Sequence, residues 1–120
     1  MASLQSKGFG TPDEVRPFAG KGAAQVVTVA GSPVIKSRFE PGWRWSENVR
    51  PIAGTDSCQS PHFLYMLSGR MHVVMNDGTA AEVGPDEVVH IEPGHDAWVV
   101  GDEPCIAVDF GPSPAYAKQQ

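Results

Sequence analysis

The chain has 120 residues, the size of about one domain, because single hydrophobic cores organise on the order of 100 to 150 residues. Nine Lys and Arg against fourteen Asp and Glu leave a net charge of −5, which disfavours nucleic acid and anionic lipid as partners. No stretch approaches the roughly 20 apolar residues of a bilayer helix, and the N-terminal residues lack the apolar core of a secretion signal. We therefore expect a cytoplasmic globular protein without a membrane partner.

Thirteen glycines and eleven prolines interrupt the chain too often for a helical bundle. Their spacing predicts an irregular N-terminal arm over residues 1–24 and short strands after it. The expected strands are Gln25 to Ala30, Val34 to Glu40, Trp43 to Glu47, His62 to Leu67, Arg70 to Met75, Thr79 to Val83, Glu87 to Ile91, Asp96 to Val100 and Cys105 to Phe110. Asp77-Gly78 is the strongest hairpin signal among the turns, because tight primed turns need positive φ.

Connections this short join antiparallel neighbours and leave no room for crossover helices. The sequence therefore predicts an all-β fold, a closed or nearly closed antiparallel β-barrel or jelly roll over residues 25–112, with under about a tenth of the residues helical. Residues 113–120 are expected to form a frayed C-terminal tail. The one long connection, Val49 to Pro61, is the loop in which a site is expected, because sites often lie on irregular loops of rigid β scaffolds.

Two segments carry a family resemblance. The first contains Pro41-Gly42 and ends in Tyr65-Met66-Leu67-Ser68-Gly69, and the second runs from Gly84-Pro85-Asp86 through an apolar strand to Pro93-Gly94-His95. Over about residues 33 to 110 the chain resembles the cupin superfamily, which implies a cupin-like β-barrel. Aligned with the first cupin motif, the usual two histidines fall on Asp56 and Cys58 and the glutamate falls on His62. The histidine of the second motif falls near Ala97, two residues after His95.

None of the four usual ligands is retained in kind, yet Asp, Cys and His all bind metals. Cys58 and His62 are four residues apart, which places them on the same face of an extended chain, and His95 shares the parity of position 97. We predict a metal site of Cys58, His62 and His95 in which Cys58 and His62 are also catalytic, holding zinc or iron(II), and a site without a metal is the alternative. A packed core histidine and a small buried thiol are the structural alternatives for His62 and Cys58.

The other titratable candidates favour structural roles. Asp56 lies in Gly54-Thr55-Asp56-Ser57, where a turn role is more probable than ligation. His72 and His90 lie in strands at positions expected to face outward, and Cys105 lies in an apolar last strand.

Aromatic and sulfur-containing side chains predict a pocket wall. In the expected strand Trp43 to Glu47, alternation places Trp43 and Trp45 on one face and Arg44 on the other. Together with Met66 and Trp98, Trp45 and Arg44 are predicted to contact a flat, partly apolar small molecule, although core packing explains the same pattern equally well.

The resemblance implies a small-molecule enzyme that uses the barrel interior, of the lyase, isomerase, cyclase or dioxygenase type. The alternative is a non-catalytic binding or sensor barrel with a degenerate metal site, which the loss of every usual ligand favours. The resemblance also implies a homodimer, which exposed strand edges make physically reasonable.

Overall fold

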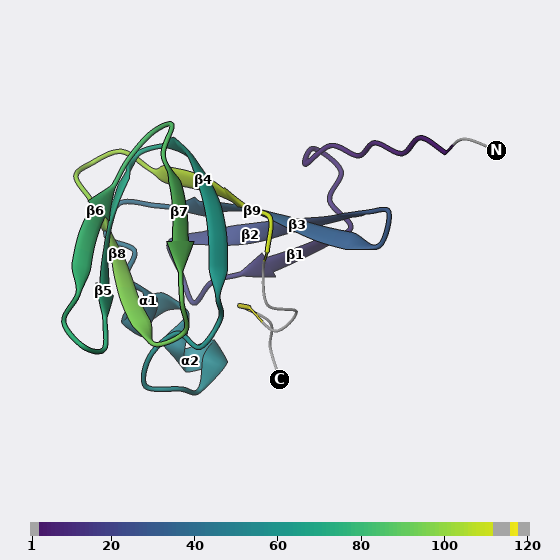
Figure 1. The fold of residues 1–120 in the computed structure, drawn as a ribbon. Helices are drawn as coiled ribbons and strands as arrows, with labels where there is room; N and C mark the ends of the chain where they lie inside the picture. The colour runs from purple at the N-terminus through teal and green to yellow at the C-terminus, as the bar shows by residue number, and fades with distance from the viewer. Residues whose placement is uncertain (1–2, 112–115, 118–120) are drawn as a thin grey trace.

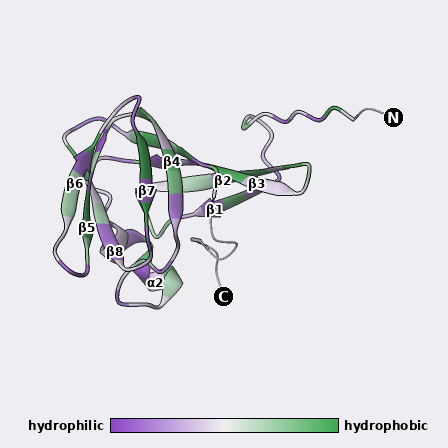
Figure 2. Cartoon of the chain, in the orientation of Figure 1, coloured by the Kyte–Doolittle hydropathy of each residue, from purple (hydrophilic) through white to green (hydrophobic). Residues whose placement is uncertain are grey.

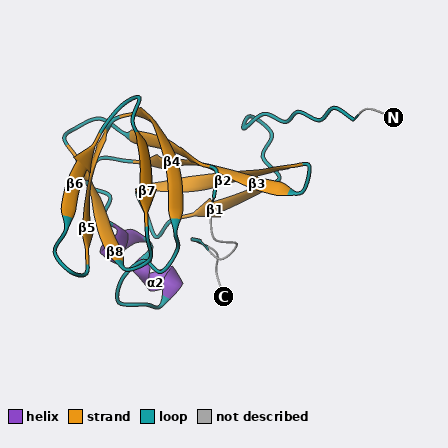
Figure 3. Cartoon of the chain, in the orientation of Figure 1, coloured by secondary structure: helices purple, strands orange, loops and turns teal. Residues whose placement is uncertain are grey.

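The computed structural model describes residues 3–111 and 116–117. Antiparallel strands dominate the described part of the chain, and two four-residue helices lie at one end of the molecule (Figure 1, Figure 3). The strands are β1 (Glu14–Pro17), β2 (Gly22–Val29), β3 (Ser32–Phe39), β4 (His62–Ser68), β5 (Arg70–Met75), β6 (Ala80–Val83), β7 (Val88–Ile91), β8 (His95–Val100) and β9 (Cys105–Asp109). The helices are α1 (Trp45–Asn48) and α2 (Arg50–Ala53).

Two sheets form the body of the fold. A six-stranded sheet has the order β1-β2-β3-β9-β4-β7 and a three-stranded sheet has the order β6-β5-β8, with every pairing of these strands antiparallel. Figure 1 shows the small sheet standing beside β4 and β7, while β1, β2 and β3 extend to the other side. The predicted all-β jelly-roll class is confirmed, but the two sheets do not close into one barrel.

The core lies between the sheets, where side chains of successive strand residues alternate between the inside and the outside. The pattern is regular in β8, where His95, Ala97 and Val99 are buried and the residues between them are more exposed. Strand β9 repeats it with Cys105, Ala107 and Asp109. In Figure 2 the same alternation gives several strands mixed hydropathy colours. A polar side chain at an inward position therefore reaches the interior of the fold.

The hairpin between β5 and β6 follows the prediction from Asp77-Gly78. Gly78 has a φ of 93°, and its N–H donates to the Met75 carbonyl at 2.9 Å. The Asp77 carboxylate accepts a hydrogen bond from the Thr79 N–H at 2.9 Å. The local sequence signal therefore gave the place of the hairpin, whereas positive φ in this turn is confined to Gly78 and the turn is not of the primed type.

The expected strand over Trp43 to Glu47 is wrong, because helix α1 begins at Trp45. The Asn48 side chain accepts a hydrogen bond from the Arg44 N–H at 3.0 Å and donates to the Ala19 carbonyl at 2.8 Å. A helical turn also brings Trp45 and Val49 to the same buried face. The local Asn48–Arg44 bond, the long-range bond from Asn48 to Ala19 and the burial of Trp45 with Val49 favour the helix over the extended form.

Both termini of the chain differ from the expected irregular segments. Strand β1 lies within the predicted N-terminal arm and pairs in register with β2. Of the predicted tail, residues 113–115 and 118–120 lie outside the described residues, whereas Tyr116 and Ala117 are buried, so the prediction of a frayed end is wrong for these two. In the described part of the chain, no helix has the length and apolar character needed to cross a bilayer.

Candidate metal centre

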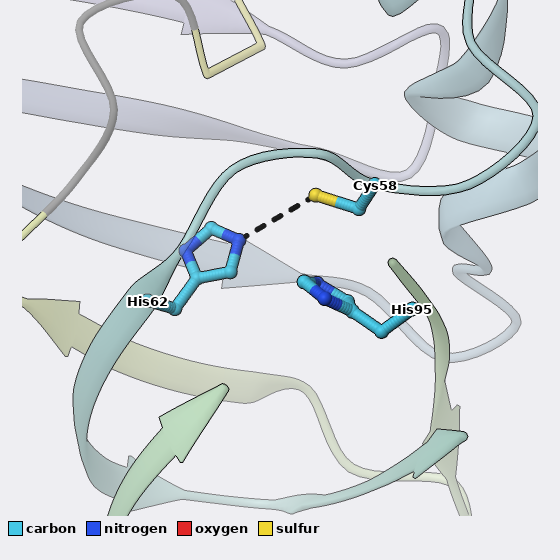
Figure 4. A group of neighbouring side chains, drawn as sticks. All are labelled: Cys58, His62 and His95. Carbon is cyan, nitrogen blue, oxygen red and sulfur yellow. Dashed lines mark hydrogen bonds between the residues drawn. The ribbon is translucent and has the colours of Figure 1, made fainter. Parts of the chain in front are cut away.

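Cys58, His62 and His95 meet inside the fold, and the ligand atoms that they offer lie within 4.8 Å of one another (Figure 4). All three residues are buried. They come from three parts of the chain: the loop before β4, the first residue of β4 and the first residue of β8. The structure thus brings together the three residues that sequence analysis selected as metal ligands.

The backbone fixes Cys58 directly against His95. The Cys58 N–H donates to the His95 carbonyl at 2.7 Å, and the His95 N–H donates to the Cys58 carbonyl at 3.3 Å. Gly94, with a φ of 94°, turns the chain before His95, and its N–H also donates to the Cys58 carbonyl, at 2.6 Å. This short bridge anchors the loop that carries the thiol, although Cys58 lies outside the named strands.

Each imidazole makes a hydrogen bond through its Nδ1 atom. Nδ1 of His62 donates to Asp109 Oδ2 at 2.6 Å, and Nδ1 of His95 donates to the Glu92 carbonyl at 2.8 Å. These bonds leave Nε2 of each ring available, and Nε2 of His62 lies 3.6 Å from Cys58 Sγ. Metal-binding histidines in proteins commonly donate their other ring N–H to a carboxylate or a backbone carbonyl.

Asp109 is a buried carboxylate with a complete set of partners. Its Oδ1 atom accepts hydrogen bonds from the Phe63 N–H at 3.1 Å and the Gly111 N–H at 3.0 Å, while Oδ2 faces His62. Strand β9 pairs with β4, so Asp109 and His62 become neighbours although 47 residues separate them. Sequence analysis missed Asp109. It could have been found because Asp109 lies two and four residues after Ala107 and Cys105 in an apolar strand, so alternation points its carboxylate to the same inner face.

The electrostatics favour a charged thiolate and imidazolium pair. Burial opposes ionisation of Cys58, but hydrogen bonds from His62 and His95 outweigh it and lower the thiol pKa from 9.0 to about 6. Burial also disfavours the charged form of His62, yet its bonds to Asp109 and Cys58 raise its pKa from 6.5 to about 9. Between these two pH values the proton therefore resides on His62 rather than on Cys58.

A small cavity of about 30 Å³ adjoins the two histidines. Aromatic and apolar side chains make most of its wall, and the polar side chains in the wall are Ser37, His62, His95, Asp109 and Tyr116. The remaining lining residues are Phe39, Trp43, Trp45, Leu64, Met71, Ile91, Ala97 and Ala107. The indole N–H groups of Trp43 and Trp45 are buried and have no hydrogen-bond partner among the described residues. The cavity is thus a largely apolar chamber whose polar wall includes the two candidate metal ligands His62 and His95.

Of the four residues predicted to contact a small molecule, Trp45 alone lines this cavity. Met66 is fully buried in the core away from it. Arg44 stacks its guanidinium over the Trp98 ring at 4.2 Å, and Trp98 in turn stacks on His72. Arg44, Met66 and Trp98 therefore lie outside the lining of this cavity.

The remaining candidates lie where sequence analysis expected them, outside the metal-binding group. Asp56 is fully exposed and pairs with Arg50 at 3.2 Å. His90 is exposed on β7. Cys105 is buried in β9, where burial raises the pKa of its thiol to about 12. At the second motif, His95 rather than Ala97 supplies the ligand atom, while Ala97 contributes only a methyl group to the cavity wall.

The spacing of the Cys58 and His62 donors fits a transition metal such as zinc, and the ligand atom of His95 lies within 4.8 Å of both. Zinc binds thiolate sulfur at about 2.3 Å and imidazole nitrogen at about 2.0–2.1 Å, so tetrahedral ligands lie roughly 3.4–3.6 Å from one another. The 3.6 Å separation of Cys58 Sγ and His62 Nε2 agrees with this spacing. A set of three protein ligands that leaves one position open is typical of catalytic rather than structural zinc.

No family model and no curated protein matches this sequence. Solved structures do match its fold. The polyketide cyclase RemF from Streptomyces resistomycificus has a TM-score of 0.63 at 18% identity, over 92% of this chain and 80% of its own. A Klebsiella pneumoniae protein with a double-stranded beta-helix domain has a TM-score of 0.58 at 19% identity, over 91% and 92% of the two chains. A cupin-like protein from Thermotoga maritima has a TM-score of 0.54 at 18% identity, over 90% and 79%.

The fold is a cupin fold. The resemblance found in the two sequence motifs is thus confirmed at the level of the fold. This fold brings the two motif segments together: the first carries Cys58 and His62, and the second carries His95.

Proposed function

We propose that this protein is a metal-dependent enzyme that acts on a small organic molecule inside the cupin fold. The observation that carries the proposal is the convergence of Cys58 Sγ with two imidazoles whose Nδ1 atoms are already hydrogen-bonded. Zinc or iron(II) suits a mixed thiolate and imidazole donor set. The reaction belongs to the lyase, isomerase, cyclase or dioxygenase type.

When bound, the metal supplies Lewis-acid polarisation of a carbonyl or enol oxygen. The chain's own residues prepare that chemistry. Asp109 holds His62 in the tautomer that keeps Nε2 free, and the Glu92 carbonyl does the same for His95. Ala97 offers no donor atom, so a metal held by Cys58, His62 and His95 would have room for water or a substrate oxygen on the side of the cavity. The apolar wall, which includes Trp45 and Phe39, limits the water around the reacting group.

The likeness to a polyketide cyclase, at 18% identity, shows the fold alone. The grouping of Cys58, His62 and His95, rather than that likeness, supports an enzyme over a storage or sensor role. It leaves the reaction type open among the four classes.

The direct test is the metal content of protein purified without a histidine tag. We expect about one equivalent of zinc or iron per chain, measured by elemental analysis. The matched control is His72→Ala, because His72 lies in β5 outside the metal-binding group and its loss should leave the metal content unchanged. Protein that carries no metal and takes up neither zinc nor iron(II) in a calorimetric titration would contradict the proposal.

A metal-free function is the second candidate, and the Cys58, His62 and Asp109 chain of contacts favours it. Cys58 Sγ lies 3.6 Å from His62, and His62 lies 2.6 Å from Asp109, which is a relay suited to proton transfer. In such a site His62 acts as a general acid or base on the bound molecule. A non-catalytic binding barrel remains the rival, because the usual cupin ligands are all replaced.

We also propose that the protein pairs as a homodimer. Strands β1 and β7 are the edges of the large sheet, and Val15 on β1 and Val88 on β7 are exposed apolar side chains. Sedimentation at high micromolar concentration should show a dimer. A monomer at every concentration would contradict this part of the proposal.

A further inference from the structure

Tyr116 fills one end of the cavity beside the metal-binding group. Its side chain is 6% exposed, and its ring meets the His62 ring edge to face, with centroids 4.8 Å apart and an interplanar angle of 87°. The same residue lines the cavity together with His95 and Asp109. An aromatic ring of the chain itself therefore lies where a substrate would have to approach His62.

Tyr116 is packed in the core, but its hydrogen bonding to the rest of the fold is sparse. Neither Tyr116 nor Ala117 belongs to a strand or a helix. Arg16 on β1 donates from Nη1 to the Tyr116 carbonyl at 2.9 Å, and Glu14 holds the Arg16 guanidinium through Nε and Nη2 at 2.8 and 3.3 Å. Among the hydrogen bonds of the described residues, the one from Arg16 is the only one that reaches Tyr116. The ring is thus held by packing and one backbone contact.

The space left beside Tyr116 is too small for a ring-sized molecule. The cavity measures about 30 Å³, whereas an engineered apolar cavity that binds benzene has a volume of about 150 Å³. Withdrawal of the Tyr116 side chain adds a space with the shape of a phenol ring, bordered by His62, His95 and the aromatic wall. That space is flat and apolar, and its polar groups lie at the metal-binding end.

We propose that Tyr116 occupies the ring-binding subsite of this site and that the substrate is a small planar ring compound bearing an oxygen substituent, which binds by displacing the Tyr116 side chain. The role of the oxygen substituent rests on the proposed function, in which this oxygen binds at the group formed by Cys58, His62 and His95. We infer a planar substrate because the subsite already holds the planar ring of Tyr116. The substrate and the Tyr116 side chain compete because both rings would occupy the same position.

The test uses p-cresol, which reproduces the tyrosine side chain as a free molecule, titrated by calorimetry into the metal-free full-length protein. Tyr116→Ala should bind p-cresol at least about tenfold more tightly than the unaltered protein, because the subsite is vacant. Arg16→Gln, which keeps Tyr116 but removes its carbonyl contact, should bind it several-fold more tightly. Arg38→Gln is the matched control, because Arg38 pairs with Glu40 on the exposed surface and contacts neither Tyr116 nor the cavity.

Equal affinity for p-cresol in the unaltered protein and in Tyr116→Ala would overturn the proposal. A gain in Tyr116→Ala without any gain in Arg16→Gln would also overturn it, because Tyr116 would then be a fixed wall and the new binding an artefact of the hole. If Tyr116→Ala does not fold, the comparison of Arg16→Gln with Arg38→Gln decides alone. The non-planar 4-methylcyclohexanol should bind Tyr116→Ala about tenfold more weakly than p-cresol, and equal binding would contradict the planar class.

Zinc titration of the same variants separates this inference from the proposed function. Tyr116→Ala retains Cys58, His62 and His95, so its zinc affinity should match that of the unaltered protein. Failure of the unaltered protein to bind zinc would overturn the metal-dependent function and leave the p-cresol result to decide the role of Tyr116.

Discussion

Cys58 and Cys105 are both buried free thiols, yet their surroundings give them opposite chemistry. Burial in the hydrophobic core raises the pKa of Cys105 to about 12. At Cys58 burial acts in the same direction, but hydrogen bonds from His62 and His95 lower the pKa to about 6. The comparison teaches that burial alone keeps a thiol protonated, and that two neighbouring imidazoles lower its pKa enough to give the thiolate that a metal would need.

The largest effect that follows from this comparison is that of pH on zinc affinity. Between about pH 6 and pH 9 Cys58 is already a thiolate while His62 carries a proton, so zinc must displace that proton to reach Nε2. Affinity should therefore rise about tenfold per pH unit, or roughly a thousandfold from pH 6 to pH 9. Calorimetry in buffers of different ionisation enthalpy should count about one proton released per zinc at pH 7.5.

Below about pH 6 Cys58 is protonated as well, and zinc binding then has to release a second proton. The dependence of affinity on pH should become steeper there. An affinity that stays constant from pH 6.5 to 8.5 would show that the pair is not the metal site.

The next largest effect is the loss of a ligand. Cys58→Ala or His62→Ala should weaken zinc binding by at least about a hundredfold, because two donors remain of three. Calorimetric titration of zinc measures the change directly. The outcome that contradicts the site is a lower melting temperature in His62→Ala with zinc uptake intact, which is the behaviour of a merely packed histidine.

A smaller effect is expected from Asp109→Asn. The asparagine can keep its oxygen on the Phe63 and Gly111 N–H groups, which turns its NH₂ toward Nδ1 of His62. The neutral His62 ring then carries its proton on Nε2, the atom that faces Cys58, instead of on Nδ1, and zinc affinity measured at about pH 9 should fall about tenfold. The readouts are zinc calorimetry and thermal unfolding, with little change in the second. Unaltered zinc affinity would show that Asp109 does not orient His62.

The smallest effect on the site is expected at the other thiol. Cys105→Ala should leave zinc affinity unchanged, since Cys105 is no part of the metal-binding group. It should lower the free energy of unfolding by about 1–2 kcal/mol, because removal of the sulfur leaves a small void in a core position that is fully buried. Chemical denaturation measures this loss. Weaker zinc binding in this variant would mean that the two cysteines are not independent.

Much of the site was predictable because parity along a strand is a local property. His62 and His95 begin β4 and β8, and their inward direction follows from the alternation that continues through Met66 and Ala97. Cys58 was predictable through the motif alignment, and the backbone bridge to His95 explains why its thiol reaches the group without belonging to a strand. Of the predicted pocket wall, Arg44, Met66 and Trp98 do not line the cavity, because alternation assigns a face but does not say which inward residues border an empty space.

Sequence alone determined the all-β class and the hairpin at Asp77-Gly78, because glycine and proline spacing and side-chain alternation act within a few residues. The three candidate metal ligands came from the motif resemblance together with that alternation. Tertiary structure decided the rest. The pairing of β9 with β4 joins Asp109 to His62, and the contact of Arg16 with the Tyr116 carbonyl joins residues 100 positions apart. No local preference encodes such contacts, because they depend on the order of the strands in the sheet and on which surfaces remain to be covered once it has formed.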